Sequence, residues 1–186
     1  LLRNLRKMKI KTQKLTLAAV FLCIGLTLPL LTMQVKEIGD TLLPMHFPVM
    51  LCGLICGWQY GLAVGAVLPF LRSLIFSMPP MFPNAIWMAA ELATYGLVIG
   101  LVYYFLKNKN ILGIYISLIT AMLSGRVVWG IVKALLLSAN EFTFKMFLIG
   151  GFVDSLLGII LQLIIIPFLT VVILKINRRE ENARII

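Results

Sequence analysis

The sequence predicts an all-α integral membrane protein, built as six transmembrane helices in a compact bundle with the N- and C-termini in the cytoplasm. Three observations lead to this expectation. Hydrophobic residues make up 61% of the chain and charged residues 13%, so the apolar surface exceeds what a soluble core of this size buries. The apolar residues form blocks long enough to cross a bilayer. Basic residues, which give a net charge of +10, gather at both ends.

The first apolar block, 14–33, follows a basic segment, 1–13, and so superficially resembles a secretory signal. Its apolar stretch is longer than the roughly 7–15 residues of a signal-peptide core, and no small-residue cleavage site follows it. We therefore expect a retained first helix. Basic residues before this helix and in the tail, 177–186, place both termini on the cytoplasmic side, because Lys and Arg accumulate there. The number of crossings is then even.

An even number requires the apolar block 47–77 to contain two helices. As one helix it would be about 46 Å long, against a hydrocarbon core of about 30 Å. The segment Gly57–Gly61, with the sequence Gly-Trp-Gln-Tyr-Gly, supplies a turn, because glycine relaxes the backbone and Trp and Tyr settle at the headgroups. A single tilted helix is the alternative. The short first arm of the hairpin should lie against the bundle interior.

The predicted membrane domain is 14–176, and its six helices are 14–33, 47–57, 60–77, 84–106, 111–139 and 146–175.

Ionisable residues concentrate in the outer half of this predicted bundle. Charges inside a membrane are costly unless paired or hydrated, so each one is a functional candidate. Aromatic and amide side chains at similar depth add hydrogen-bonding and stacking surface. We therefore predict an outward-facing pocket for a small, partly polar ligand. Its candidate residues are His46, Arg72, Asn84, Trp87, Glu91, Tyr95, Arg126, Trp129, Lys133 and Asp154.

Two interpretations of these charges stay open. Glu91 and Asp154 would pair with Arg72 and Arg126 simply to hold the helices together, or some of the charges would contact a ligand. Three cations, including Lys133, against two carboxylates leave a positive charge that an anionic group such as a carboxylate satisfies.

Other functions fit the sequence less well. A pore or proton relay would line its whole path with polar groups, although a stand-alone secondary transporter or channel remains the alternative. A membrane enzyme would need a catalytic pair at a recognisable spacing, so we expect no enzyme and no cofactor. Nothing accompanies the basic segments that would stack or read bases, so no nucleic-acid partner is expected. Cys52 and Cys56 are expected to pack rather than to hold a metal.

The run "MHFPVMLCGLICGWQYGLAVGAVLPFLRSLIFSMPP", from Met45 to Pro80, and the segment "ELATYG", from Glu91 to Gly96, resemble the substrate-binding S components of energy-coupling factor (ECF) vitamin transporters. The resemblance extends over about 9–175, and its most specific part is Pro48-Val49 followed by glycines at spacings of four residues. It implies a protein of the bacterial cytoplasmic membrane, surrounded by lipid, without an ATPase or catalytic site of its own.

Proteins of this family bind a vitamin outside, dock on a transmembrane coupling subunit with two ATPase subunits, and topple in the membrane to release the vitamin inside. The family often uses Ala-x-x-x-Ala on helix one for docking. The nearest match here is Ala19 and Cys23, which departs from that pattern. Among substrates, the two quoted segments look most like pantothenate-type S components. Riboflavin, folate, cobalamin and pyridoxine-type compounds are the alternatives.

Overall fold

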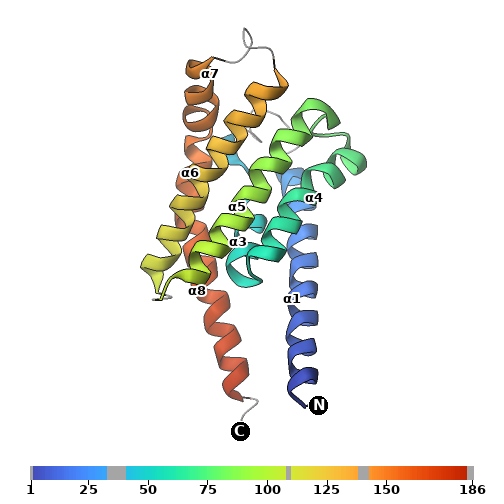
Figure 1. Cartoon of the computed structure of the whole chain (residues 1–186), viewed down its shortest axis with the longest axis vertical. Coiled ribbons are helices and arrows are strands. Elements are labelled where there is room, and N and C mark those ends of the chain that lie inside the picture. The colour runs from blue at the N-terminus through green and yellow to red at the C-terminus, as the bar shows by residue number, and fades with distance from the viewer. Residues whose placement is uncertain (1, 33–40, 108–109, 138–142, 184–186) are drawn as a thin grey trace.

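The computed structural model describes residues 2–32, 41–107, 110–137 and 143–183, and within these ranges every regular element is a helix (Figure 1). Seven α-helices are described, together with one 3-10 segment and two π-helical turns. In chain order these are α1 Leu2–Thr27, η1 Leu28–Thr32, α3 His46–Ile55, α4 Trp58–Phe76, η2 Met81–Ala85, α5 Ile86–Phe105, α6 Ile111–Leu136, α7 Phe144–Leu148, η3 Ile149–Val153 and α8 Leu156–Ala183.

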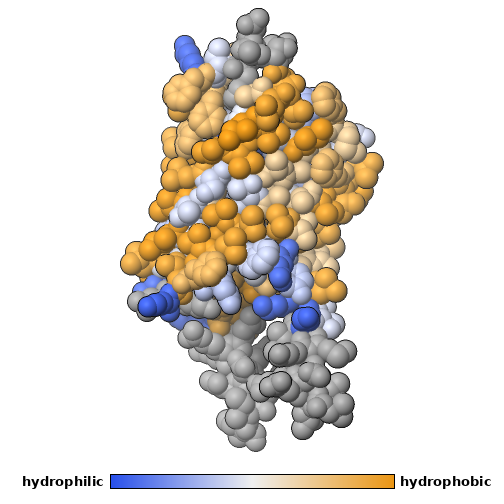
Figure 2. Space-filling view, in the orientation of Figure 1, coloured by the Kyte–Doolittle hydropathy of each residue, from blue (hydrophilic) through white to orange (hydrophobic). Residues whose placement is uncertain are grey.

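Five helical segments of the described chain are long and apolar enough to cross a membrane. They are Lys11–Leu30, Trp58–Phe76, Met81–Phe105, Ile111–Leu136 and Leu156–Ile176. Apolar side chains cover most of the face shown in Figure 2, and hydrophilic ones gather near one end of the described surface. The lipid-facing composition of a membrane protein is therefore present on the outside of the bundle.

The helix α3 is the short arm that the sequence analysis expected. It has 10 residues, about 15 Å at 1.5 Å per residue, which is half of a hydrocarbon core. Eight of those residues are buried, because α1, α4, α5 and α8 all contact α3. A helix that cannot span the bilayer alone is thus enclosed by helices that can.

The chain turns between α3 and α4 at Gly57, inside the segment proposed from the sequence. Gly57 has φ 106°, a backbone conformation that side chains with a β-carbon rarely adopt. Tyr60, in the first turn of α4, donates from its hydroxyl to the Lys11 carbonyl at 3.5 Å. The hairpin turn therefore also meets the basic half of α1.

Glycines let the backbones of α3, α4 and α5 approach one another closely. A β-carbon on Gly61 would lie 2.6 Å from the carbonyl oxygen of Gly96, and one on Gly53 would lie 2.6 Å from the same oxygen. Both distances are too short for a real contact, so no other residue fits without moving a helix. Such small-residue crossings hold membrane helices together by close packing.

The two terminal helices extend further than the sequence analysis expected. Residues 2–13 of the basic N-terminal segment continue the first membrane helix as part of α1, and the basic tail continues α8 as far as Ala183. These ends of α1 and α8 lie at the same end of the bundle in Figure 1. The predicted last helix is also interrupted, since α7 and the π-helical η3 precede α8.

We expect Gly61→Val to destabilise the bundle by about 3 kcal/mol, because the new side chain must push the α5 backbone away. Ala63→Val, two residues along α4, is the matched control because Ala63 is exposed. Thermal unfolding in detergent measures both variants. Equal melting temperatures for the two would show that the close crossing does not stabilise the fold.

Candidate functional site

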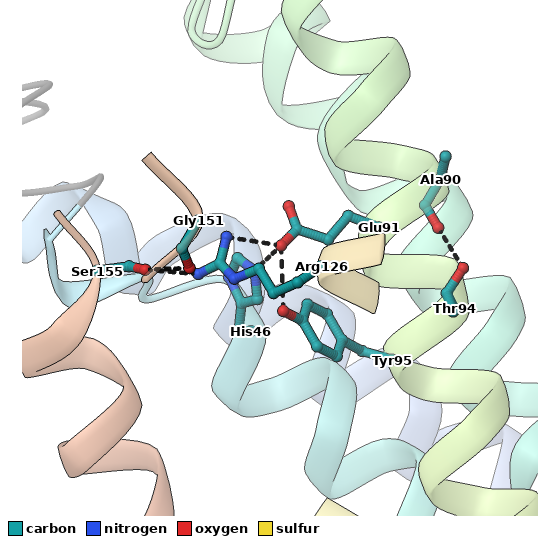
Figure 3. Close-up of polar contacts among 8 residues, drawn as sticks. All are labelled: His46, Ala90, Glu91, Thr94, Tyr95, Arg126, Gly151 and Ser155. Atoms are coloured by element: carbon teal, nitrogen blue, oxygen red, sulfur yellow. Dashed lines mark hydrogen bonds and ion pairs between the residues drawn. The ribbon is translucent and has the colours of Figure 1, made fainter. Parts of the chain in front are cut away.

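A polar network lies buried where α3, α5, α6 and the start of α8 meet (Figure 3). Its centre is the ion pair between Arg126 of α6 and Glu91 of α5, in which Arg126 Nη1 lies 2.9 Å from Glu91 Oε1. Arg126 is 4% exposed and Glu91 is 2% exposed. Two charges this deep in an apolar bundle persist only when they are paired and hydrogen-bonded.

Two further side chains contact the same carboxylate oxygen. The Tyr95 hydroxyl, one turn along α5, donates to Glu91 Oε1 at 3.1 Å. His46, the first residue of α3, places Nε2 at 3.5 Å from that oxygen, which is too long for a strong hydrogen bond. The His46 ring meets the Tyr95 ring edge-on with centroids 5.1 Å apart. Neither imidazole nitrogen of this buried histidine has a hydrogen-bond partner among the described residues.

Ser155 holds the other side of Arg126, and the sequence analysis did not select it. Arg126 Nη2 donates to Ser155 Oγ at 2.9 Å, and Ser155 Oγ donates to the Gly151 carbonyl at 2.9 Å. Ser155 is 1% exposed. The sequence signal that could have identified Ser155 is its position next to Asp154, because these are two adjacent polar residues in an otherwise apolar segment.

Asp154, which we expected in the pocket, is exposed instead. Counting residues gave its depth but not its helix face. The π-helical turn η3 ends immediately before Asp154, and a π turn inserts one extra residue into the helical register. As a result Ser155, rather than Asp154, turns toward Arg126.

Arg72 is buried but stands apart from this network. Its Nη1 donates to the Leu26 carbonyl at 2.9 Å, and its guanidinium lies over the Phe76 ring at 5.4 Å. The carbonyls in the last turn of a helix have no partner within the helix, and Leu26 is in the last turn of α1. Arg72 therefore caps α1 rather than pairing with Glu91 or Asp154, and the expectation that all six ionisable residues share one pocket is wrong.

A second group of predicted residues consists of Lys133 and two tryptophan rings beside it. The Lys133 ammonium lies 4.6 Å from the Trp129 ring and 5.4 Å from the Trp87 ring, within cation–π range. Trp129 also lies beside Phe147 of α7, with ring centroids 6.1 Å apart. Lys133 is two turns from Arg126 on the same face of α6. Asn84, in η2, is half-buried, and the structure does not join it to either group.

An apolar hollow of about 160 Å³ opens between α6 and the η3–α8 segment, with Arg126 in its lining. The other lining residues are Ile119, Met122, Leu123, Phe152, Ile159 and Leu163. Arg126 borders this hollow, but its guanidinium is turned into the network with Glu91 and Ser155, and the exposed wall of the hollow is apolar. Such a wall suits the apolar part of a small ligand. Within the described residues, no group of three potential metal ligands comes together.

The fold and the buried network define a small helical membrane protein whose polar residues converge inside the bundle, as in membrane proteins that bind or carry small solutes. Residues 13–170 match the family described as "ECF transporter, substrate-specific component". Because this match covers most of the chain, the protein belongs to that family. Neither a curated protein nor a solved structure gives a significant match. Family membership favours a transporter subunit over a stand-alone transporter or channel and implies association with an ECF energising module.

We expect Arg126→Met to lower the free energy of unfolding by about 3–5 kcal/mol, because it leaves the Glu91 carboxylate buried without its cation. The double variant Arg126→Met with Glu91→Leu should be more stable than Arg126→Met alone, since no charge is then left unpaired. Thermal unfolding in detergent of Arg126→Met, Glu91→Leu and the double variant gives a double-mutant cycle. Additive losses would show that the two residues do not stabilise each other.

Proposed function

We propose that this chain binds a small vitamin carrying a carboxylate at an outward-facing pocket, for ATP-driven uptake by an ECF transporter. Its partners are a transmembrane coupling subunit and two ATPase subunits. The chain itself has no ATPase or other catalytic role in this proposal. The observation that carries the proposal is Arg126, a buried arginine fixed at the meeting point of three membrane helices and lining a hollow.

Charge and geometry support a carboxylate group in the substrate. A guanidinium has five N–H donors, and Glu91 and Ser155 account for two of those of Arg126 within the described structure. Three donors are left for a planar acceptor, and a carboxylate matches arginine geometrically. Glu91 pairs with Arg126, and Lys133 lies two turns away on the same face of α6 with its ammonium over the Trp129 and Trp87 rings.

Pantothenate is our first choice of substrate. The resemblance of the α3–α4 hairpin and of the Glu91–Gly96 segment to pantothenate-type proteins supports it. Folate is the second carboxylate candidate. Riboflavin, cobalamin and pyridoxine-type compounds are the alternatives, and none of them needs a carboxylate contact.

For docking to the coupling subunit we propose the lipid-facing side of α1 around Ala19 and Cys23. Both residues are exposed, and their side chains are small. Small residues let the backbone of another helix approach closely in a membrane. The opposite side of α1 carries Ala18 and Phe21, which are buried in the bundle core and therefore face away from a partner.

We propose that the chain passes through the bacterial cytoplasmic membrane six times, with both termini inside. In one of these passes the helix α3 covers only about half of the hydrocarbon core, and the surrounding helices enclose it. Cysteine labelling in intact cells tests this orientation. A membrane-impermeant maleimide should label Phe144→Cys, in the exposed first turn of α7, but should not label Lys107→Cys until the cells are opened. A Cys23→Ser background removes the exposed native thiol. The reverse labelling pattern would contradict the orientation.

Purified protein should bind one member of a panel of pantothenate, folate, riboflavin, cobalamin and pyridoxine, measured by titration calorimetry without nucleotide. If the substrate is pantothenate or folate, Arg126→Ala should weaken its binding by about 2–5 kcal/mol, the cost of losing a desolvated charge pair. Arg72→Ala is the matched control, because it removes a buried arginine away from the network. Absence of binding across the panel would reject the vitamin proposal, and unchanged affinity in Arg126→Ala would reject the carboxylate contact.

A further inference from the structure

Ser155 occupies the junction between the π-helical turn η3 and the helix α8. It lies just before the first residue of α8, and its carbonyl accepts a hydrogen bond from the Ile159 amide at 2.9 Å. Its hydroxyl lies 2.9 Å from Arg126 Nη2 and forms a hydrogen bond with it. The side chain is buried, so water does not compete for these bonds.

The direction of both hydroxyl bonds follows from the chemistry of the partners. A guanidinium has no acceptor, so Ser155 Oγ must accept the bond from Arg126 Nη2. The single hydroxyl hydrogen is then left for the Gly151 carbonyl, 2.9 Å away. Because that hydrogen is committed to Gly151, the lone pairs of Oγ are held toward Arg126.

Glu91 and Ser155 hold different nitrogens of the same guanidinium. Glu91 of α5 accepts from Nη1 and Ser155 accepts from Nη2, while the Cα of Arg126 belongs to α6. A planar group held at its base and at two of its nitrogens has its plane fixed. With Glu91 alone, the guanidinium would be free to pivot about one bond.

We propose that Ser155 is a positioning residue for substrate binding. It sets the plane of the Arg126 guanidinium, and with it the direction from which a substrate carboxylate meets the donors not used by Glu91 and Ser155. This inference rests on the proposed function. It adds that selection for a carboxylate depends on the η3–α8 junction, which does not itself contact the substrate.

The test compares pantothenate with its neutral alcohol, panthenol, by titration calorimetry of the purified full chain. Ser155→Ala should weaken pantothenate binding about tenfold, since one hydrogen bond that orients the charged group is lost. Panthenol binding should change by less than about twofold in the same variant. If the panel selects folate, folate and its dimethyl ester replace this pair.

Two further variants separate positioning from stability. Ser155→Thr keeps the acceptor and should restore selection for the carboxylate, with Ser155→Cys as the smaller substitute if the added methyl prevents folding. Ser117→Ala is the matched control: Ser117 is fully buried on α6 and donates to the Gly113 carbonyl at 2.8 Å. It should leave the ratio of the two affinities unchanged.

Each outcome has a distinct meaning. Equal losses for pantothenate and panthenol in Ser155→Ala, or no loss for either, would overturn the positioning role while leaving the proposed function intact. A wild-type chain that binds only a vitamin without a carboxylate would overturn both the carboxylate contact and this inference. A wild-type chain that binds no vitamin would overturn the proposed function, and with it the inference about Ser155.

Discussion

The interior of this protein is organised by the need to keep an arginine and a glutamate charged inside a membrane. Arg126 and Glu91 come from neighbouring helices and are each almost completely buried. In a medium with so little water, every remaining donor and acceptor nearby must be supplied by protein or ligand. Tyr95 and Ser155 supply hydrogen bonds to this pair, and His46 lies 3.5 Å from the Glu91 carboxylate. The ion pair therefore dictates how α3, α5, α6 and α8 converge.

The convergence also depends on backbones that approach closely elsewhere. Gly61 and Gly96 bring α4 against α5, and Gly53 brings α3 against the same stretch of α5. This crossing places the short helix α3 under the ion pair, with His46 at its first turn. Packing at the glycines sets the distances between the helix backbones. The polar network determines which side chains meet between the helices. The two constraints meet on α5, where Tyr95 of the polar network directly precedes Gly96 of the crossing.

The sequence was sufficient for the helical composition of the protein and for the turn between α3 and α4, because both follow from lengths, hydropathy and glycine spacing. Glu91 and Arg126, which one interpretation of the sequence placed in ion pairs between helices, do meet. The partners of the Asp154 and Arg72 side chains were not predictable. A π-helical turn changes the register before Asp154, and Arg72 bonds the carbonyl of Leu26, a backbone group that has no signature in the sequence. Errors of this kind arise wherever a contact depends on local backbone geometry rather than on residue type.

The glycine crossing has a consequence for how substrate preference changes among proteins of this architecture. Substitutions at Gly53, Gly61 or Gly96 disturb backbone contacts and so threaten folding itself. The apolar residues of α6 and α8 around the hollow, such as Ile119 and Ile159, belong to other helices than these three glycines. They are the positions where new side chains alter the shape of the cavity without dismantling the bundle. If the hollow holds the substrate, as the proposed function requires, substitutions in its lining change which small molecule fits and leave the glycine crossing intact.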